Sequence, residues 1–385
     1  MHRGETGRFA LTTTAGELVR AFTPAPLPPN PPLALGGDLQ QLLEAATLAV
    51  GRLDSVLTLL PDKTTFLYSY VRKEAVLSSQ IEGTQSSLSD LLRYELDDAP
   101  GAPPFDDVVE VSTYVSALEH GLTRLRDGFP LSNRLLREMH GVLLSRGHGA
   151  TMTPGEFRRS QNWIGGTRPG NAAYVPPPHT DVPDCMASLE QFLHARDDGI
   201  PALVRAGLAH VQFETIHPFL DGNGRLGRLL ITLLLCDAGV LRDPLLYLSL
   251  YFKEHRATYY DLLNDVRRTG DWETWLTFFL EGVRVTATGA VETCQRLREL
   301  FGGDRQRIEQ GGRAGSATRL HEALTARPIL SLAAVMEQTG LSYPTVASAA
   351  DALKDLEIAG SFKSRGRRFF VYDRYLAILN EGAES

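Results

Sequence analysis

Three kinds of signal are scarce or missing in this sequence. Its 385 residues contain only three cysteines, Cys185, Cys236 and Cys294, and they form no CxxC pair. Neither a disulfide framework nor a zinc site is therefore expected. The longest apolar run, Leu229–Cys236, is far too short to span a bilayer. The first residues lack the apolar segment of a secretory signal, so we expect a reduced, cytoplasmic protein without membrane contact.

Charge is also not concentrated enough to point to a class of partner. The formal net charge is −7, and the chain is 43% hydrophobic and 22% charged. This composition is typical of a globular protein, and the length predicts two to three domains. The mildly acidic balance gives no general attraction to nucleic acid or to an anionic membrane.

Helical periodicity is present from residue 38 onward, so the expected fold class is mainly α. Residues 38–60 and 64–82 are expected to form an antiparallel helix pair across the break at Pro61 and Asp62. Before them, six prolines within 22–33 predict an extended arm lying over a helical body. Further helices are expected over residues 87–96, 104–125, 131–144, 186–195, 201–216, 223–237 and 252–300, the last with a break near Gly270.

Two stretches interrupt this pattern. Residues 146–183 are rich in glycine and proline and contain short β-like pieces, which predicts a β-hairpin flap. Residues 302–317 read as a linker, and the three short helices and basic hairpin beyond it predict a winged helix-turn-helix. We therefore expect an N-terminal arm and helical segment over 1–103, a central domain with trailing helices over 104–301, a linker over 302–316 and a winged helix over 317–385.

The run IHPFLDGNGRLGRLLITLLL, residues 216–235, is the most informative part of the chain. Pro218 ends the preceding helix and leaves His217 at the mouth of a loop. Gly222, Asn223 and Gly224 allow a tight turn that directs backbone N–H groups inward. Because the loop leads into a helix N-terminus, it predicts an anion site.

Four charged or titratable side chains accompany that loop. Arg225 and Arg228 are three residues apart, so both can project from one face of the first helical turn toward a polyphosphate. Asp221 is a natural ligand for a Mg²⁺ ion that keeps several waters. His217 is the nearby side chain whose ordinary pKa suits proton transfer at neutral pH. Together they indicate transfer chemistry at a phosphate.

The same residues carry a family resemblance. HPFLDGNGRLGR, residues 217–228, resembles the HPFx(D/E)GNGRxxR signature of Fic-domain proteins at every fixed position, whereas the P-loop pattern GxxxxGK(S/T) is absent. GEFRRSQNWIGG (155–166) and YVPPP (174–178) resemble the flap of that family. AFTPAPLPPNPPL (21–33) is similar to the N-terminal part of its members that carry a leading helical segment. SSQIEG, residues 78–83, resembles their inhibitory motif, (S/T)xxxE(G/N).

The resemblance implies AMP transfer from ATP to a Ser, Thr or Tyr hydroxyl of a target protein and of the chain itself. His217 would deprotonate that hydroxyl, and Asp221 would hold Mg²⁺. The backbone N–H groups of Gly222, Asn223 and Gly224 would stabilise charge on the phosphates. Asn223 and Arg225 would orient the phosphates, and Arg228 would hold the γ-phosphate. The target would pair with the flap as an added strand.

Glu82 has an unusual position for a carboxylate. It stands in the last turn of an expected helix, where the macrodipole disfavours negative charge. The resemblance supplies Arg228 as its cation, and a pair between Glu82 and Arg228 would occupy the place of the γ-phosphate. Ser78 lies on the same helical face and would help to hold the segment. The sequence thus predicts inhibition in cis, with an ordinary frayed helix end as the alternative.

Other interpretations stay open at this stage. The same loop could remove AMP from a modified protein, with Glu82 positioning a water. The chain could instead be a transcriptional regulator whose Fic domain senses nucleotide. Against DNA binding, residues 313–385 hold nine Lys or Arg against eight Asp or Glu, and the expected recognition helix, 343–357, is acidic. A protein contact or dimerisation is favoured for that domain. Homodimers are common in the family, although the sequence shows no interface signature.

Several other side chains are expected to be structural. His140 is expected to face the core, and His210 does not have the spacing of a metal site. Trp163 is expected to pack within the flap rather than to stack on a base.

Overall fold

The computed structural model describes most of the chain. The described residues are 3–4, 6–56, 63–96, 106–195, 198–311, 314–364 and 366–381. The expected break at Pro61 and Asp62 lies outside the described residues. Arg365, one of the basic residues expected in the wing, also lies outside them.

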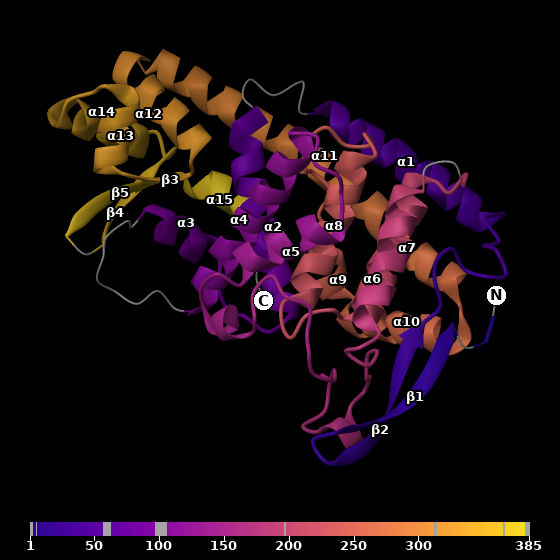
Figure 1. Cartoon of the computed structure of the whole chain (residues 1–385). Helices are drawn as coiled ribbons and strands as arrows, with labels where there is room; N and C mark the ends of the chain where they lie inside the picture. Colours follow the sequence, from indigo (N-terminus) through magenta and orange to yellow (C-terminus); the bar gives the residue numbers. More distant parts are fainter. Residues whose placement is uncertain are drawn as a thin grey trace.

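A β-hairpin precedes the proline-rich arm. Strands β1 (Gly7–Thr14) and β2 (Glu17–Pro24) are antiparallel, and the two turn residues, Ala15 and Gly16, both have positive φ. This geometry is that of a two-residue hairpin turn. The sequence predicts an extended arm over 22–33 and no strands before it, because the prolines dominate the pattern of this segment. Figure 1 shows the hairpin beside the flap.

The body of the molecule is helical, as the sequence predicted (Figure 1). Its first helices pair differently from the expectation, because α1 packs mainly along α11, whereas α2 packs against α4 and α9. Helix α1 thus packs its apolar face along a helix that is distant in sequence, and not along the next helix of the chain. The helices of the body are α1 (Asp38–Val56), α2 (Lys63–Ile81), α3 (Leu88–Leu96), α4 (Asp106–Arg126), α5 (Asn133–Leu143), α6 (Val182–His194), α7 (Ala202–Ile216), α8 (Asn223–Asp237), α9 (Ser249–Glu254), α10 (Arg256–Thr269) and α11 (Trp272–Gln310).

Helices α7 and α8 lie in the middle of this body. Every residue of α7 from Leu203 to Ile216 is buried, and α8 is buried from Leu226 to Leu235. The apolar run of α8 is therefore core, packed on α7, α4 and α5. Among the described helices, none has the length and apolar character needed to cross a membrane.

The flap has the hairpin character that the sequence predicted. Ile164 and Tyr174 form an isolated antiparallel bridge, with N–H···O distances of 2.8 and 3.1 Å. Beyond the bridge, the backbone N–H of Phe22 in β2 donates to the carbonyl of Val175 at 2.9 Å. Trp163 packs against the small apolar cluster between hairpin and flap, as expected from its setting. The N-terminal hairpin thereby supports one side of the flap.

The expected linker over 302–316 is mostly helix, which corrects that expectation. Helix α11 continues to Gln310, and α12 begins at Ala314. Asp304, 2% exposed, accepts hydrogen bonds from the Tyr372 hydroxyl at 2.6 Å and from Arg374 at 2.9 Å. The glycines and charges of this stretch resemble a linker in composition, but Asp304 anchors it to the C-terminal elements.

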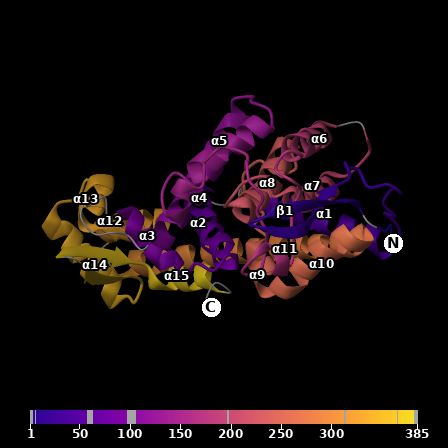
Figure 2. The same ribbon diagram turned by 60° about the horizontal axis from the view of Figure 1, so that its bottom comes forward.

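The C-terminal elements follow the order predicted for a winged helix-turn-helix, with an added strand and a final helix. They form an antiparallel sheet in the order β3-β5-β4, covered by helices. Figure 2 shows these elements at one end of an elongated molecule. Their bounds are α12 (Ala314–Ala326), β3 (Ile329–Ser331), α13 (Leu332–Thr339), α14 (Tyr343–Asp355), β4 (Gly360–Ser364), β5 (Arg367–Val371) and α15 (Asp373–Asn380).

Candidate active site

The loop between α7 and α8 is held in an unusual backbone conformation. His217 ends α7 with φ 48° and ψ 62°, and Gly222 precedes α8 with φ 73°. A left-handed non-glycine residue is uncommon and marks a position that its surroundings must hold. Here Arg158, which is 2% exposed, donates from Nε to the His217 carbonyl at 2.9 Å. Its backbone N–H donates to the carbonyl of Pro218 at 2.9 Å.

Asn223 closes the loop from the other side. Its side-chain oxygen accepts from the backbone N–H of Phe219 at 2.9 Å, and its Nδ2 donates to the carbonyl of the same residue at 3.0 Å. The sequence analysis expected this side chain to orient phosphates. In the structure both ends of the amide are used inside the loop, so the backbone N–H is the group of Asn223 that can meet an anion.

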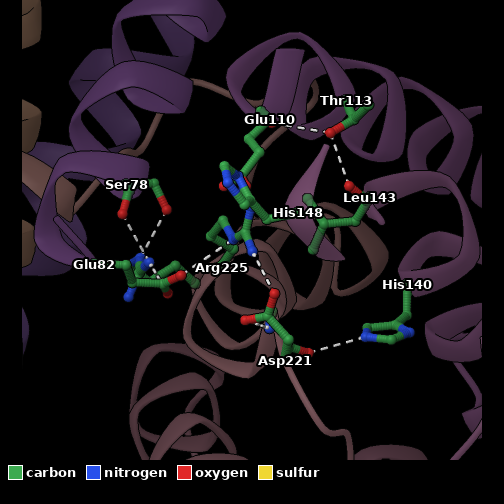
Figure 3. Close-up of polar contacts among 11 residues, drawn as sticks. Ser78, Glu82, Glu110, Thr113, His140, Leu143, His148, Asp221 and Arg225 are labelled. Carbon is green, nitrogen blue, oxygen red and sulfur yellow. Dashed lines mark hydrogen bonds and ion pairs between the residues drawn. The ribbon is translucent and has the colours of Figure 1, made fainter. Parts of the chain in front are cut away.

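His140 anchors the same loop to α5 and the flap (Figure 3). Its Nδ1 accepts from the backbone N–H of Gly155 at 2.8 Å, so Nε2 carries the proton and donates to the Asp221 carbonyl at 3.0 Å. Burial lowers the pKa of His140 to about 4, which keeps the ring neutral. His140 is core-facing, as expected, but it also fixes the backbone next to a predicted metal ligand.

The first turn of α8 presents two buried arginines to one carboxylate. Glu82 follows the end of α2, and its Oε1 lies 2.8 Å from Nη2 of Arg228. Its Oε2 lies 3.1 Å from Nε of Arg225. The two arginine side chains are 2% and 3% exposed, whereas that of Glu82 is 27% exposed. The contact between Glu82 and Arg228 that the sequence predicted is therefore present, and a second one accompanies it.

Ser78 also contacts Arg228, by two groups. Nε of Arg228 donates to the Ser78 hydroxyl at 2.7 Å, and Nη2 donates to the Ser78 carbonyl at 2.9 Å. Burial lowers the pKa of Arg228, but the neighbouring carboxylates of Glu82 and Glu214 raise it above its ordinary value. This arginine is thus charged and buried, and Nε and Nη2 of its guanidinium bind the end of α2.

A second acid, Glu110 of α4, contributes to the site, and the sequence analysis did not single it out. Its Oε2 lies 3.1 Å from Nη1 of Arg225, whose Nη2 lies 3.5 Å from Oδ2 of Asp221 (Figure 3). Arg225 therefore lies among three carboxylates. Because Glu110 stands far from the signature in sequence and in an ordinary helical context, no local pattern could have identified it.

The imidazole of His217 is uncharged at neutral pH. Its Nδ1 is buried and has no hydrogen-bond partner among the described residues. Burial, followed by the charges of Arg158 and Arg267, lowers its pKa to about 3, so the imidazole is neutral near pH 7. Arg267 of α10 also donates to the Thr215 hydroxyl at 3.1 Å, which places a second cation next to this end of α7.

The residues at Asp221 fit a Mg²⁺ ion that is shared with phosphate oxygens and water. The Asp221 side chain is 41% exposed, and its Oδ1 accepts from the backbone N–H of Gly222 at 2.7 Å. Among the described residues, no three His, Cys, Asp or Glu side chains gather as a metal cage. A single accessible carboxylate is the kind of ligand set with which Mg²⁺ retains its waters.

Gly224 lets Glu82 approach α8. A Cβ at this position would lie 2.4 Å from Oε1 of Glu82 and 3.0 Å from Nη1 of Arg228. The carboxylate therefore lies against the backbone of the helix N-terminus, where the helix dipole favours negative charge. An anionic group is already seated where the sequence predicts that a phosphate binds.

His210 is structural, as expected. Its Nδ1 donates to the carbonyl of Gly227 at 2.9 Å, and its Nε2 accepts from the Tyr259 hydroxyl at 2.9 Å. These bonds tie α7 to α8 and α10 inside the core. Tyr259 itself is 1% exposed.

Two family models match the chain. The model described as "Fic/DOC family N-terminal" matches residues 40–123, and the one described as "Fic/DOC family" matches residues 130–235. The second range contains the whole loop, the flap and the two arginines of α8. The first contains α2 with Ser78 and Glu82.

Curated relatives and a solved structure are similar to parts of the chain. "Protein adenylyltransferase Fic" of Culex quinquefasciatus is 37% identical over 147 residues, which are 38% of this chain and 26% of that protein. The protein of the same name from Drosophila grimshawi is 34% identical over 145 residues, 37% of this chain and 27% of that protein. The chain thus spans about a quarter of the length of these relatives.

The fold likeness covers more of the chain. A Fic family protein from Desulfovibrio desulfuricans G20 has a TM-score of 0.58 and 21% sequence identity, and the match covers 88% of this chain and 97% of that one. At that identity the likeness concerns the fold.

Proposed function

We propose that the chain is a protein adenylyltransferase of the Fic/DOC family, which transfers AMP from ATP to a hydroxyl group of a target protein and of itself, and the two matching family models support this proposal. The observation that carries this proposal is the neutral His217 at the mouth of an anion-binding loop whose helix begins with two buried arginines. The shared name of the curated relatives supports the same reaction class.

In this proposal His217 is the general base. A Ser, Thr or Tyr hydroxyl loses its proton to His217 while its oxygen attacks the α-phosphorus of ATP, and pyrophosphate leaves. Burial, followed by the charges of Arg158 and Arg267, keeps His217 neutral before the reaction. Arg158 also fixes the backbone at His217 through the carbonyl contact, so the imidazole is held in place before substrate binds.

The phosphates would bind at the start of α8. The backbone N–H groups of Asn223 and Gly224 would face them, together with Arg225 and with Arg228 at the γ-phosphate, whereas the Gly222 N–H is held by Oδ1 of Asp221 in this structure. Asp221 would hold Mg²⁺, which supplies charge neutralisation between the phosphates when it is bound. The Asn223 side chain would act indirectly, through its two bonds to Phe219.

The target protein would bind along the outer edge of the flap. The backbone groups of Ile164 and Tyr174 are used by their mutual bridge, and Val175 is bound by Phe22 of the hairpin. Successive residues of a strand direct their backbone groups to opposite sides. Trp163, which precedes Ile164, therefore presents the edge to which an extended segment of the target would add as a strand, whereas Gly165 with its φ of 67° leaves the extended conformation.

Inhibition would come from Glu82. While its carboxylate is bound to Arg228 and Arg225, the γ-phosphate cannot take the same position, and ATP is held away from the productive geometry. A charge-assisted hydrogen bond is worth about 1.5–3 kcal/mol, so its release raises activity by roughly tenfold or more. Ser78 would keep Arg228 in the inhibited arrangement.

The test is self-labelling of the purified chain with ATP labelled in the α-phosphate. The wild type is expected to label weakly, Glu82→Gly more strongly, and His217→Ala not at all in either background. His179→Ala, which changes an exposed histidine, is the matched control and should label like its parent. If His217→Ala labels as well as its parent, the assignment of the base is wrong.

A second assay separates the reverse reaction. The variants are incubated with an AMP-modified target, and release of AMP is measured. Faster removal by the wild type than by Glu82→Gly, without any labelling by either, would contradict the proposed direction.

A further inference from the structure

A cavity of about 270 Å³ lies behind the helix that carries Ser78 and Glu82. Its walls come from α2, from residues 247–254, and from α11 and α15. On α2 it is lined by Tyr70, Lys73, Glu74 and Leu77, which immediately precede Ser78. The cavity therefore borders the part of α2 just before Ser78. Arg228 binds the end of the same segment through Ser78 and Glu82.

Two buried polar atoms in this lining have no hydrogen-bond partner among the described residues. They are Oε2 of Glu74 and the hydroxyl of Tyr247, in side chains that are 3% and 5% exposed. The other oxygen of Glu74 accepts from Ser249 and, at 3.3 Å, from the Tyr114 hydroxyl. A buried polar atom without a hydrogen bond lowers the stability of the fold by about 1–3 kcal/mol. Two such atoms in residues that line one cavity therefore suggest a bound molecule that forms hydrogen bonds with them.

The charge of the lining points to a cation. Four carboxylates line the cavity, and the two cations, Lys73 and Arg296, are both engaged by Glu381. The rest of the wall is mostly apolar, with Leu77, Leu250 and Val285 among its residues, although Thr286 and Thr293 also line it. A free carboxylate oxygen and a hydroxyl inside apolar walls suit a small ammonium on an apolar body.

We propose that this cavity is a binding site for a small primary amine with an apolar body. Its ammonium donates to Oε2 of Glu74 and to the Tyr247 hydroxyl, and its body packs against Leu77 and Leu250. Glu74 is one helical turn before Ser78, so an occupant that joins α2 to its neighbours also holds Ser78 and Glu82 on Arg228. The amine thereby strengthens inhibition, a consequence that rests on the proposed adenylyltransferase function.

Binding is measured by calorimetry on the full chain with two probes, phenethylammonium and hexylammonium, near pH 7.5. The matched control ligand is 2-phenylethanol, which has the skeleton of the first probe without its charge. At least one amine is expected to bind with one-to-one stoichiometry, and the alcohol is not. Glu74→Gln and Tyr247→Phe should each weaken amine binding, by about tenfold for Glu74→Gln.

Tyr372→Phe is the control variant, because it removes the hydroxyl of a buried tyrosine in the C-terminal elements. It should bind the amine like the wild type, and thermal unfolding of each variant checks that it is folded. Binding of the alcohol as tightly as the amine would overturn the proposal. So would amine binding that neither cavity variant alters, or the absence of amine binding at millimolar concentration.

A second readout separates this proposal from the proposed function. The bound amine should lower self-labelling of the wild type and leave that of Glu82→Gly unchanged. If the chain labels nothing while the amine still binds through Glu74, the enzymatic proposal fails and the site stands. If labelling follows the predicted pattern and no amine binds, the site fails alone.

Discussion

At the scale of single residues, the site depends on one carboxylate that joins two buried arginines. Arg225 and Arg228 have almost no access to water, so each needs a negative partner inside the protein. In the described structure Glu82 is the negative partner of both arginines, and Glu110 and Asp221 are two further carboxylates close to Arg225. In the proposed function, the triphosphate of ATP would replace Glu82 as the anionic partner of both arginines.

This replacement predicts that ATP changes the free energy of unfolding of the chain. Glu82→Gly should lower the free energy of unfolding by about 1–3 kcal/mol without nucleotide, since it leaves Arg228 and Arg225 with fewer partners. Added Mg²⁺–ATP should stabilise the variant more than the wild type, as urea unfolding with and without nucleotide will show. Glu281→Gln, which breaks an exposed pair with Arg284, is the control and should change both values by less than about 0.5 kcal/mol.

Ser78 and Ser79 make a matched pair for a second prediction. Both are fully buried, but only the Ser78 hydroxyl is bound by Arg228, whereas that of Ser79 has no partner among the described residues. Ser78→Ala should raise self-labelling, because Arg228 loses its contact with the Ser78 hydroxyl. The increase should be limited to roughly threefold to tenfold, because the Ser78 carbonyl still holds Arg228. Ser79→Ala should leave labelling at the wild-type level. Equal effects of the two substitutions would contradict a specific role for Ser78.

At the scale of elements, His140 joins α5, the flap and the loop before α8. The ring contacts Gly155 on one side and Asp221 on the other, and its pKa of about 4 lies below the ordinary value of 6.5. As the pH falls from about 6.5 toward 4, the unfolded chain binds a proton at this histidine that the folded chain does not. The contribution of His140 to stability is therefore lost in that window as the pH falls.

The resulting prediction concerns the slope of stability against pH. The wild type should be more stable than His140→Gln at pH 7.5, and the difference should shrink by up to about 3 kcal/mol on going to pH 4.5. Urea unfolding at several pH values measures it. His179→Gln, at an exposed position, should follow the wild type throughout. A constant difference between the wild type and His140→Gln would show that the ring is not buried in its neutral form.

The elements also show which parts of the fold the sequence could predict. The anion-binding loop at 217–228 could be predicted from the sequence, because its glycines, proline and arginines lie close together and each has a local physical role. The contact of Glu82 with Arg228 followed from the resemblance. Glu110 and Arg158 could not be recognised, because their roles depend on contacts with residues far away in the chain.

Composition misled in two places. The stretch over 302–316 has the glycines of a linker, but Asp304 and Ile308 are buried and hold α11 against the C-terminal elements. The prolines of the N-terminal arm hid the hairpin before it, whose turn residues, Ala15 and Gly16, are not the strongest hairpin signal. In both cases packing partners decided the local structure.

At the scale of the whole molecule, the C-terminal elements contact α2, the helix that carries Ser78. The Tyr375 hydroxyl donates to the Ser69 hydroxyl at 3.1 Å, and Lys73 donates to the Glu381 carbonyl at 2.8 Å. These contacts come from α15 and the residue that follows it, and both reach α2 upstream of Ser78. The arrangement favours a role for this end of the molecule in protein contacts, including contacts with α2.

A gel shift tests the opposite view, in which the C-terminal elements read DNA. With a net charge of −7 and an acidic α14, the chain should not bind genomic DNA fragments even at low salt, where the electrostatic contribution is largest. Binding at low salt that weakens steeply as salt is added would contradict this prediction. Lys363→Glu would then show whether the hairpin of β4 and β5 is responsible.

The most direct test of the account is self-labelling with α-labelled ATP, compared among the wild type, Glu82→Gly and the double variant Glu82→Gly with His217→Ala. The account predicts weak labelling by the wild type, labelling increased by about tenfold or more in Glu82→Gly, and none in the double variant. Labelling of Glu82→Gly at or below the wild-type level, or labelling of the double variant at the level of Glu82→Gly, would contradict it.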